Sequence, residues 1–213
     1  GSLDSGFGTG GEVSYNFADH IPSTIEGVSV ASDFAELPDG RLMVCGSWFS
    51  SSGSSDDFVC MQFLAGGTPD PAFAPVLIPF NLGGGFHDYA FRVRRDAQGR
   101  FVVAGVAQVA VVTYGDTYNY NCAIVRLRAN GQLDPSFGVE GRVLIDSRFA
   151  SNDINPDYDN GCFGLLLQPD GKIVAAGWDA IGTVTQGANT LPDTLIKVVR
   201  LIGDTIFDDR FGN

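Results

Sequence analysis

An acidic stretch at residues 152–161, N-D-I-N-P-D-Y-D-N-G, places side-chain oxygens at alternate positions. Calcium prefers about six to eight hard oxygen ligands, and alternate residues of an extended loop can face one ion. The stretch departs from the common calcium-binding pattern, because Tyr158 stands where a glycine is expected and no glutamate follows. A solvated acidic loop is therefore the alternative to a calcium site. The candidate ligands are Asp153, Asn155, Asp157 and Asp159.

The segment G-G-G-F-H-D-Y at 83–89 sets His87 beside Asp88, two side chains that could act in acid–base chemistry. Adjacent residues of an extended chain point to opposite sides, so the two are poorly placed as a catalytic dyad. The chain has only two histidines and lacks the G-x-S-x-G motif of a serine nucleophile. We therefore expect His87 to have a structural role in its loop, and the sequence assigns no catalytic residue.

Three sequence elements recur in constant order and must position these side chains. The first, L-D-x-x-F-G, recurs at Asp4, Asp70, Asp134 and Asp208, with spacings of 66, 64 and 74 residues. The second surrounds a tight Asp-Gly or Gln-Gly turn, and the third is an apolar run. Such a period indicates an array of equivalent structural units. The second element occupies 37–46, 96–105 and 168–177, and the third occupies 57–64, 122–129 and 195–202.

Each unit is typical of four short strands. Glycine accepts a positive φ and closes a hairpin between two apolar runs, and no stretch has a helical period. The sequence therefore predicts an all-β fold: a β-propeller of three four-stranded antiparallel blades, within one repeat domain over residues 1–213. The aspartate of L-D-x-x-F-G should bond the backbone two residues on, and the phenylalanine should pack between neighbouring units. The predicted blades cover about 9–66, 75–130 and 141–204.

The chain resembles the delta-60 repeat β-propellers. Their signature is close to L-D-x-S-F-G-x-x-G, then Q-P-D-G-K-I-V-x-A-G, then a strand ending in Arg-Leu. L-D-P-S-F-G-V-E-G-R-V (133–143), Q-P-D-G-K-I-V-A-A-G (168–177) and V-V-R-L (198–201) carry the resemblance. In the second copy Pro69, Ala74 and Gln98 replace the usual Leu, Gly and Asp. The resemblance implies a propeller, commonly in exported or surface bacterial proteins, and no shared activity.

In an antiparallel meander, successive connections fall at alternate ends. The Asp-Gly turns and the L-D-x-x-F-G joints should share one end, and longer loops that differ between units should share the other. Function usually resides in varied loops. Aromatic side chains around a polar cleft suit sugar or peptide ligands, whereas the alternative is that they only pack on loop backbone. The candidate ligand-binding residues of this loop end are Trp48, Trp178, Tyr114, Tyr118, His87 and Asp88.

The four cysteines fall into two pairs of contexts. Cys45 and Cys60 lie in apolar runs and are expected to be buried small hydrophobic residues. Cys122 begins a strand of the second unit and Cys162 begins a strand of the third. Both should therefore lie at the loop end of neighbouring blades, where an oxidising compartment would let them form a disulfide.

The net charge of −12 would repel nucleic acid, and no apolar run is long enough to insert in a membrane as a helix. We therefore expect a non-enzymatic binding or interaction scaffold in a secreted, periplasmic or cell-surface location, with a carbohydrate or protein ligand and no cofactor except calcium. The alternatives are a propeller hydrolase or lyase with an acidic or calcium-containing central site, and a purely architectural module.

Three blades do not close a ring, because propellers have about four to eight. The chain starts with L-D-x-x-F-G and stops just after another copy at 207–212, so each end carries half of a joint. Two copies could then close a six-bladed ring as a homodimer. The alternative is a longer chain whose further blades close the ring within one molecule.

Overall fold

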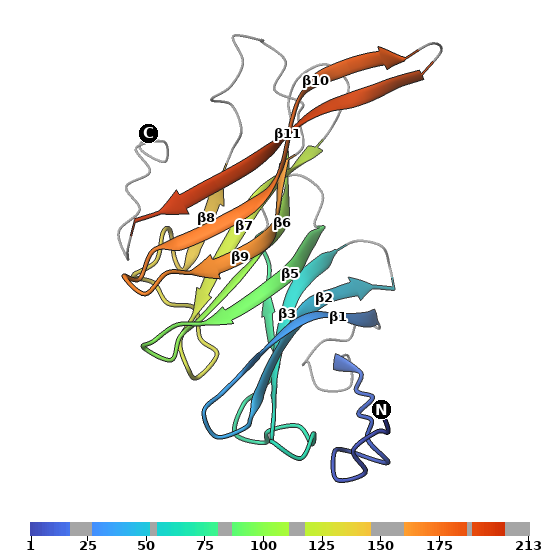
Figure 1. Cartoon of the computed structure of the whole chain (residues 1–213), viewed down its shortest axis with the longest axis vertical. Coiled ribbons are helices and arrows are strands. Elements are labelled where there is room, and N and C mark those ends of the chain that lie inside the picture. Colours follow the sequence, from blue (N-terminus) through green and yellow to red (C-terminus); the bar gives the residue numbers. More distant parts are fainter. Residues whose placement is uncertain are drawn as a thin grey trace.

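The computed structural model describes residues 1–17, 27–51, 55–80, 87–110, 118–145, 160–186 and 189–202. These residues form three antiparallel sheets and no α-helix, so the predicted all-β fold is confirmed (Figure 1). The first sheet contains β1 (Gly27–Glu36), β2 (Leu42–Ser50), β3 (Asp56–Phe63) and β4 (Val76–Ile78). The second contains β5 (Asp88–Arg95), β6 (Phe101–Ala110), β7 (Tyr118–Leu127) and β8 (Arg142–Ile145). The third contains β9 (Asn160–Leu167), β10 (Ile173–Gln186) and β11 (Asn189–Leu201).

The predicted blade boundaries are one strand out of step with these sheets. The prediction places 76–78 and 142–145 at the start of the second and third blades, but β4 pairs with β3 and β8 pairs with β7. The sheets therefore span about 27–78, 88–145 and 160–201. The reason is the compact joint, which turns the chain back beside the strand it has just left. The third sheet has three strands among the described residues instead of the predicted four.

Three hairpin turns of the same conformation connect β1 to β2, β5 to β6 and β9 to β10. Gly40, Gly99 and Gly171 each have a φ of 83°, which glycine adopts without the steric cost of a side chain. Each also donates its backbone N–H to the carbonyl three residues earlier. After each turn, the second strand of the sheet pairs with the third. The pairs nearest the turns are Leu42–Phe63, Phe101–Leu127 and Ile173–Leu201, and they align the three sheets residue by residue.

The L-D-x-x-F-G joints have the predicted local structure. The Asp4, Asp70 and Asp134 carboxylates each accept a hydrogen bond from the backbone N–H two residues on. Phe73 is buried between the first and second sheets, and Phe137 is buried between the second and third. Both predictions for this motif are therefore confirmed in the copies that lie between two sheets.

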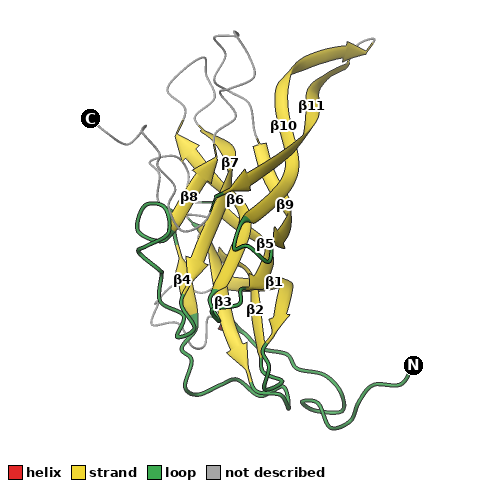
Figure 2. Ribbon diagram, turned by 60° about the vertical axis from the view of Figure 1, so that its left-hand side comes forward, coloured by secondary structure: helices red, strands yellow, loops and turns green. Residues whose placement is uncertain are grey.

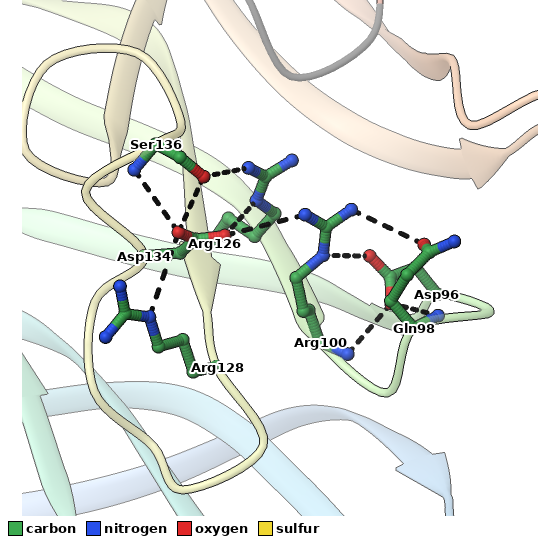
Figure 3. A network of polar contacts seen from close by, with 7 residues as sticks. All are labelled: Asp96, Gln98, Arg100, Arg126, Arg128, Asp134 and Ser136. Atoms are coloured by element: carbon green, nitrogen blue, oxygen red, sulfur yellow. Dashed lines mark hydrogen bonds and ion pairs between the residues drawn. The ribbon is translucent and has the colours of Figure 1, made fainter.

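A polar network fastens the joint between β7 and β8 to the second sheet (Figure 3). Arg126 donates from Nε to Asp134 at 2.9 Å and from Nη2 to the Ser136 hydroxyl at 3.0 Å. Its guanidinium also lies 4.7 Å from the centre of the Phe137 ring. Arg100 extends the network, since it pairs with Asp96 at 2.6 Å and approaches Asp134 at 3.6 Å. The charged side chains at the Gln-Gly turn end of the second sheet therefore have a structural role.

Each sheet has a front face toward the next sheet along the chain and a back face toward the preceding one. The first core cluster joins the front face of the first sheet, with Met43 and Phe58, to the back face of the second, with Val93 and Phe101. The second cluster joins Val102 and other front-face residues of the second sheet to the back face of the third. The sheets therefore stack front to back, as blades of a propeller do (Figure 1).

The strands at the loop end are longer than predicted. The segment 178–194 lies between the second and third sequence elements of the last unit, where a long loop is expected, and it is largely a hairpin in which β10 and β11 stay paired as far as Gln186 and Asn189. Figures 1 and 2 show this hairpin extending past the ends of the neighbouring strands.

Candidate functional site

The loop end lies opposite the Asp-Gly turns, as the alternating meander predicts. In β2, Leu42 is next to the turn, whereas Trp48 pairs with Ser29 and Asp57 near the far ends of the strands. In β10, Ile173 is next to the turn and Trp178 pairs with Gly161 farther along. Trp48 therefore lies in the loop-end half of β2, and Trp178 is level with the loop-end residue Gly161 of β9, although β10 continues beyond it to Gln186. The two tryptophans belong to different sheets, the first and the third.

A histidine–carboxylate pair bridges the first and second sheets at this end. The Nδ1 atom of His87 lies 2.7 Å from Oδ2 of Asp56, and the His87 side chain is 30% exposed. The backbones of the same two residues form a parallel bridge between the sheets. His87 thus packs on Asp56, not on its neighbour Asp88, as expected for adjacent residues of an extended chain. The pair can fix the orientation of the imidazole, and it also joins the first blade to the second.

Aromatic rings surround this pair. The Tyr89 hydroxyl donates to the same Asp56 oxygen at 2.9 Å. The Tyr89 ring lies 5.7 Å from Phe49 and 5.9 Å from Tyr120, measured between ring centres. Burial, followed by the hydrogen bonds to Tyr120 and Asp56, raises the pKa of Tyr89 above its usual range. The phenol therefore stays a neutral hydrogen-bond donor.

Two further carboxyl groups lie in the same region. Asp88 is buried and accepts backbone hydrogen bonds from Phe80 at 2.9 Å and Gln108 at 3.1 Å. Burial raises the pKa of Asp88 to about 6 in spite of these bonds. Burial, and then the charges of Asp88 and Asp56, raises the pKa of Asp57 to about 6. A group of carboxyls with raised pKa can mark a functional site, and it can equally result from structural burial.

The predicted ligand-binding residues do not form one group. Trp48 is buried on the back face of the first sheet with Phe17, Val59 and Met61. Trp178 is half-buried in β10 of the third sheet. Tyr114 lies outside the described residues. Tyr118 is the first residue of β7, and only its backbone is described. His87 and Asp88 are close in sequence but make separate contacts.

All four cysteines form disulfides. Cys122 of β7 is joined to Cys162 of β9, with Cα atoms 5.0 Å apart, so this bond links the second and third sheets. Cys45 and Cys60 face each other across β2 and β3 and are also joined, with Cα atoms 4.2 Å apart. The expected burial of Cys45 and Cys60 is confirmed, but the two are bonded to each other and are not separate small hydrophobic residues. Two buried cysteines opposite each other on paired strands are close enough to bond.

The proposed calcium ligands Asp153, Asn155, Asp157 and Asp159 lie outside the described residues. Within the described part of the chain, no three His, Cys, Asp or Glu side chains are grouped so that they could hold a metal ion. The calcium site therefore stays a prediction.

Sequence reasoning missed Asp56, Tyr89 and the Cys45–Cys60 bond. Asp56 and His87 are 31 residues apart, and only the pairing of the two blades brings them together. The acidic pair D-D at the start of the apolar run 56–63 was a usable signal, because charged residues seldom begin a buried strand without a partner.

Among the described residues, no helix is long and apolar enough to cross a bilayer. A comparison with curated proteins gives no match. A family profile, described as "Domain of unknown function (DUF5122) beta-propeller", matches residues 37–73, 99–137 and 168–188. The first two segments run from an Asp-Gly or Gln-Gly turn to the following joint, and the third begins at the equivalent turn. These repeated matches, together with three sheets stacked front to back, identify the chain as a β-propeller repeat protein.

Proposed function

We propose that the chain is a non-enzymatic binding or interaction scaffold of a secreted or surface bacterial protein, and that its repeats are of the delta-60 kind. The ligand, a carbohydrate or a protein, binds at the loop end. The observation that carries this proposal is that Asp56 and Asp88 at the loop end are engaged in structural hydrogen bonds. Asp56 accepts from His87 and Tyr89, and Asp88 accepts from two backbone amides, so these groups fasten strand ends of the first and second sheets to one another.

The disulfides support an extracytoplasmic location. Disulfides persist in oxidising compartments and are rare where thiols are kept reduced. Four of four cysteines are paired here, and one bond joins two blades. A measurement on protein from the native host tests this point. Protein alkylated before reduction should carry no label on cysteine, whereas a label at all four positions would overturn the proposed location.

Tryptophan fluorescence offers a direct binding test, because the chain has only two tryptophans. A Trp48→Phe variant leaves Trp178 as the single reporter, on a strand of the loop end. The probes are a glycan array and a peptide array, followed by titration of each hit. We expect a saturable change in Trp178 emission that is lost in a Tyr120→Ala variant and kept in Asp39→Asn at the opposite end. Hits that bind Tyr120→Ala and the unchanged protein equally would contradict a loop-end site.

One observation favours the alternative, a hydrolase. The His87–Asp56 pair at 2.7 Å has the orientation of a general base with a carboxylate behind it. Ester, glycoside and phosphoester chromogenic substrates should then be turned over, with a rate that falls at least about 100-fold in His87→Gln. Turnover that survives this substitution would indicate a contaminant and leave the scaffold proposal in place.

A further inference from the structure

On the front face of the third sheet, β11 is exposed, whereas the equivalent strands β3 and β7 of the other two sheets are buried. Phe63, Leu127 and Leu201 are equivalent residues of β3, β7 and β11. Five residues before them, Ile196 of β11 corresponds to Phe58 of β3 and Cys122 of β7. Phe58 and Cys122 are 0% exposed, whereas Ile196 is 88% exposed. Two residues farther along, Cys60 and Ile124 are 0% exposed and Val198 is 64% exposed. The third sheet thus presents an apolar surface that in its two equivalents is covered by the next blade.

On the back face of the first sheet, β1 is exposed in the same way. Phe34 of β1 pairs with Val44, and its equivalents are Val93 of β5 and Leu165 of β9. Val93 is 0% exposed and Leu165 is 8% exposed, whereas Phe34 is 61% exposed.

Beside Phe34, a cavity of about 320 Å³ is lined by Leu42, Val44 and Phe63 of the first sheet and by Tyr15 and Phe17. The hydroxyl of Ser29, which also lines this cavity, has no hydrogen-bond partner among the described residues. In the other two sheets the preceding blade covers the equivalent back face.

Residues 13–17 already occupy one strand position of such a preceding blade. Tyr15 and Phe17 pack on the back face of the first sheet, as their equivalents Ile78 of β4 and Phe80 pack in the cluster between the first and second sheets. The turn before this segment has the Thr9–Glu12 bridge, which corresponds to the Val139–Arg142 bridge before β8. By the same alignment, Val13 corresponds to Val143, which pairs with Ile124 of β7. The residue of the third sheet equivalent to Ile124 is Val198.

We propose that the front face of the third sheet docks on the back face of the first sheet in a second copy of this chain. In the contact, residues 13–17 of the second copy extend the sheet beside β11, with Val13 next to Val198. The occupant is a second copy because each chain carries both unfilled halves of one blade junction. The inference does not depend on the ligand proposed for the loop end.

The contact is head to tail, so two copies related by a two-fold axis make it twice. Exposed, unpaired edges and apolar faces of this kind favour association in general. The net charge of −12 on each copy opposes association, so added salt should strengthen the dimer.

Analytical ultracentrifugation and light scattering between 1 and 100 µM test the dimer. We expect the mass to rise with concentration toward twice 22.6 kDa. Ile196→Asp and Phe34→Asp should each weaken association at least tenfold, because each places a charge in an apolar junction. The matched control is Val28→Asp, since Val28 is equally exposed on β1 but faces the opposite side of the first sheet, and it should change association less than twofold.

Mixing the two weakened variants distinguishes a head-to-tail contact from other dimers. Ile196→Asp keeps an intact back face and Phe34→Asp keeps an intact front face, so an equimolar mixture should associate more tightly than either variant alone. A double variant, Val13→Cys with Val198→Cys, should form a covalent dimer on a non-reducing gel, and Val13→Cys with Val139→Cys should not.

A mass of one chain at every concentration, or equal effects of Val28→Asp and Ile196→Asp, would overturn the proposal. The first result would assign the bare faces to further blades of a longer chain. Circular dichroism of every variant checks that the variant is folded, so that a loss of association is not caused by a loss of folding.

Discussion

Arg126 Nε lies 2.9 Å from Asp134 Oδ2, and both side chains are almost completely buried. The pair ties the joint between β7 and β8 to the middle of the second sheet. Removing one partner of a buried ion pair leaves the other charge uncompensated, which costs about 3–5 kcal/mol. An intact joint is therefore required for the stability of the fold.

Asp134→Asn should lower the free energy of unfolding by about 3 kcal/mol, because it strands the Arg126 guanidinium in the core. Urea denaturation followed by circular dichroism measures the change. The control is Asp39→Asn, which removes an exposed ion pair with Arg41 and should change the free energy of unfolding much less, because solvent screens exposed charges. Equal effects of the two substitutions would contradict the assigned role of Asp134.

The same carboxyl should make the protein sensitive to acid. Burial raises the pKa of Asp134, but the Ser136 hydrogen bonds and the Arg126 charge outweigh it and hold the pKa below its usual range. A group with a lowered folded-state pKa stabilises above its unfolded pKa, and the contribution is lost as the pH falls through the folded value. Stability of Asp134→Asn should therefore fall less between pH 5 and pH 2 than that of the unchanged protein.

Asp57 should have the opposite pH dependence. Its pKa is raised to about 6, so its contribution to stability is fully present below about pH 4 and is lost as the pH rises through 6. Asp57→Asn should stabilise the protein at pH 7 by about 1 kcal/mol, after allowance for solvent screening, and flatten the profile between pH 4 and 7. Glu36→Gln on the exposed side of β1 is the control. A profile that is unchanged in Asp57→Asn would show that this carboxyl is not desolvated.

The two disulfides should contribute differently. The chain-entropy relation gives about 3 kcal/mol for a separation of 15 residues, as between Cys45 and Cys60, and about 4 kcal/mol for 40 residues, as between Cys122 and Cys162. Only the second bond joins two sheets. Cys122→Ala with Cys162→Ala should therefore release the third blade to limited proteolysis within 160–201. The matched pair Cys45→Ala with Cys60→Ala should lower stability without this selective cleavage.

Calcium should raise the melting temperature if residues 153–159 bind it in the folded state, because a ligand of the folded form stabilises by mass action. Differential scanning fluorimetry with 5 mM calcium against a chelator measures the shift. A variant with Asp153→Asn and Asp157→Asn should lose it. No shift with calcium would remove the calcium proposal.

Local sequence determined the turns and joints of this protein. The Asp-Gly turns follow from the positive φ that glycine allows, and the joints follow from an aspartate that bonds the backbone two residues on. Both depend only on contacts a few residues apart. The order of the strands and the two ends of the sheets could be predicted for the same reason, because an antiparallel meander alternates its connections.

The tertiary structure decided which distant segments meet. It assigned 76–78 and 142–145 to the preceding sheets, continued the β10–β11 hairpin, and paired His87 with Asp56 and Cys45 with Cys60. These outcomes depend on which strand edge is free and on how two sheets stack, and neither is encoded in a short window. The bare faces at Phe34 and Ile196 are likewise visible only when equivalent positions are compared in space, since burial is a property of the neighbour and not of the residue itself.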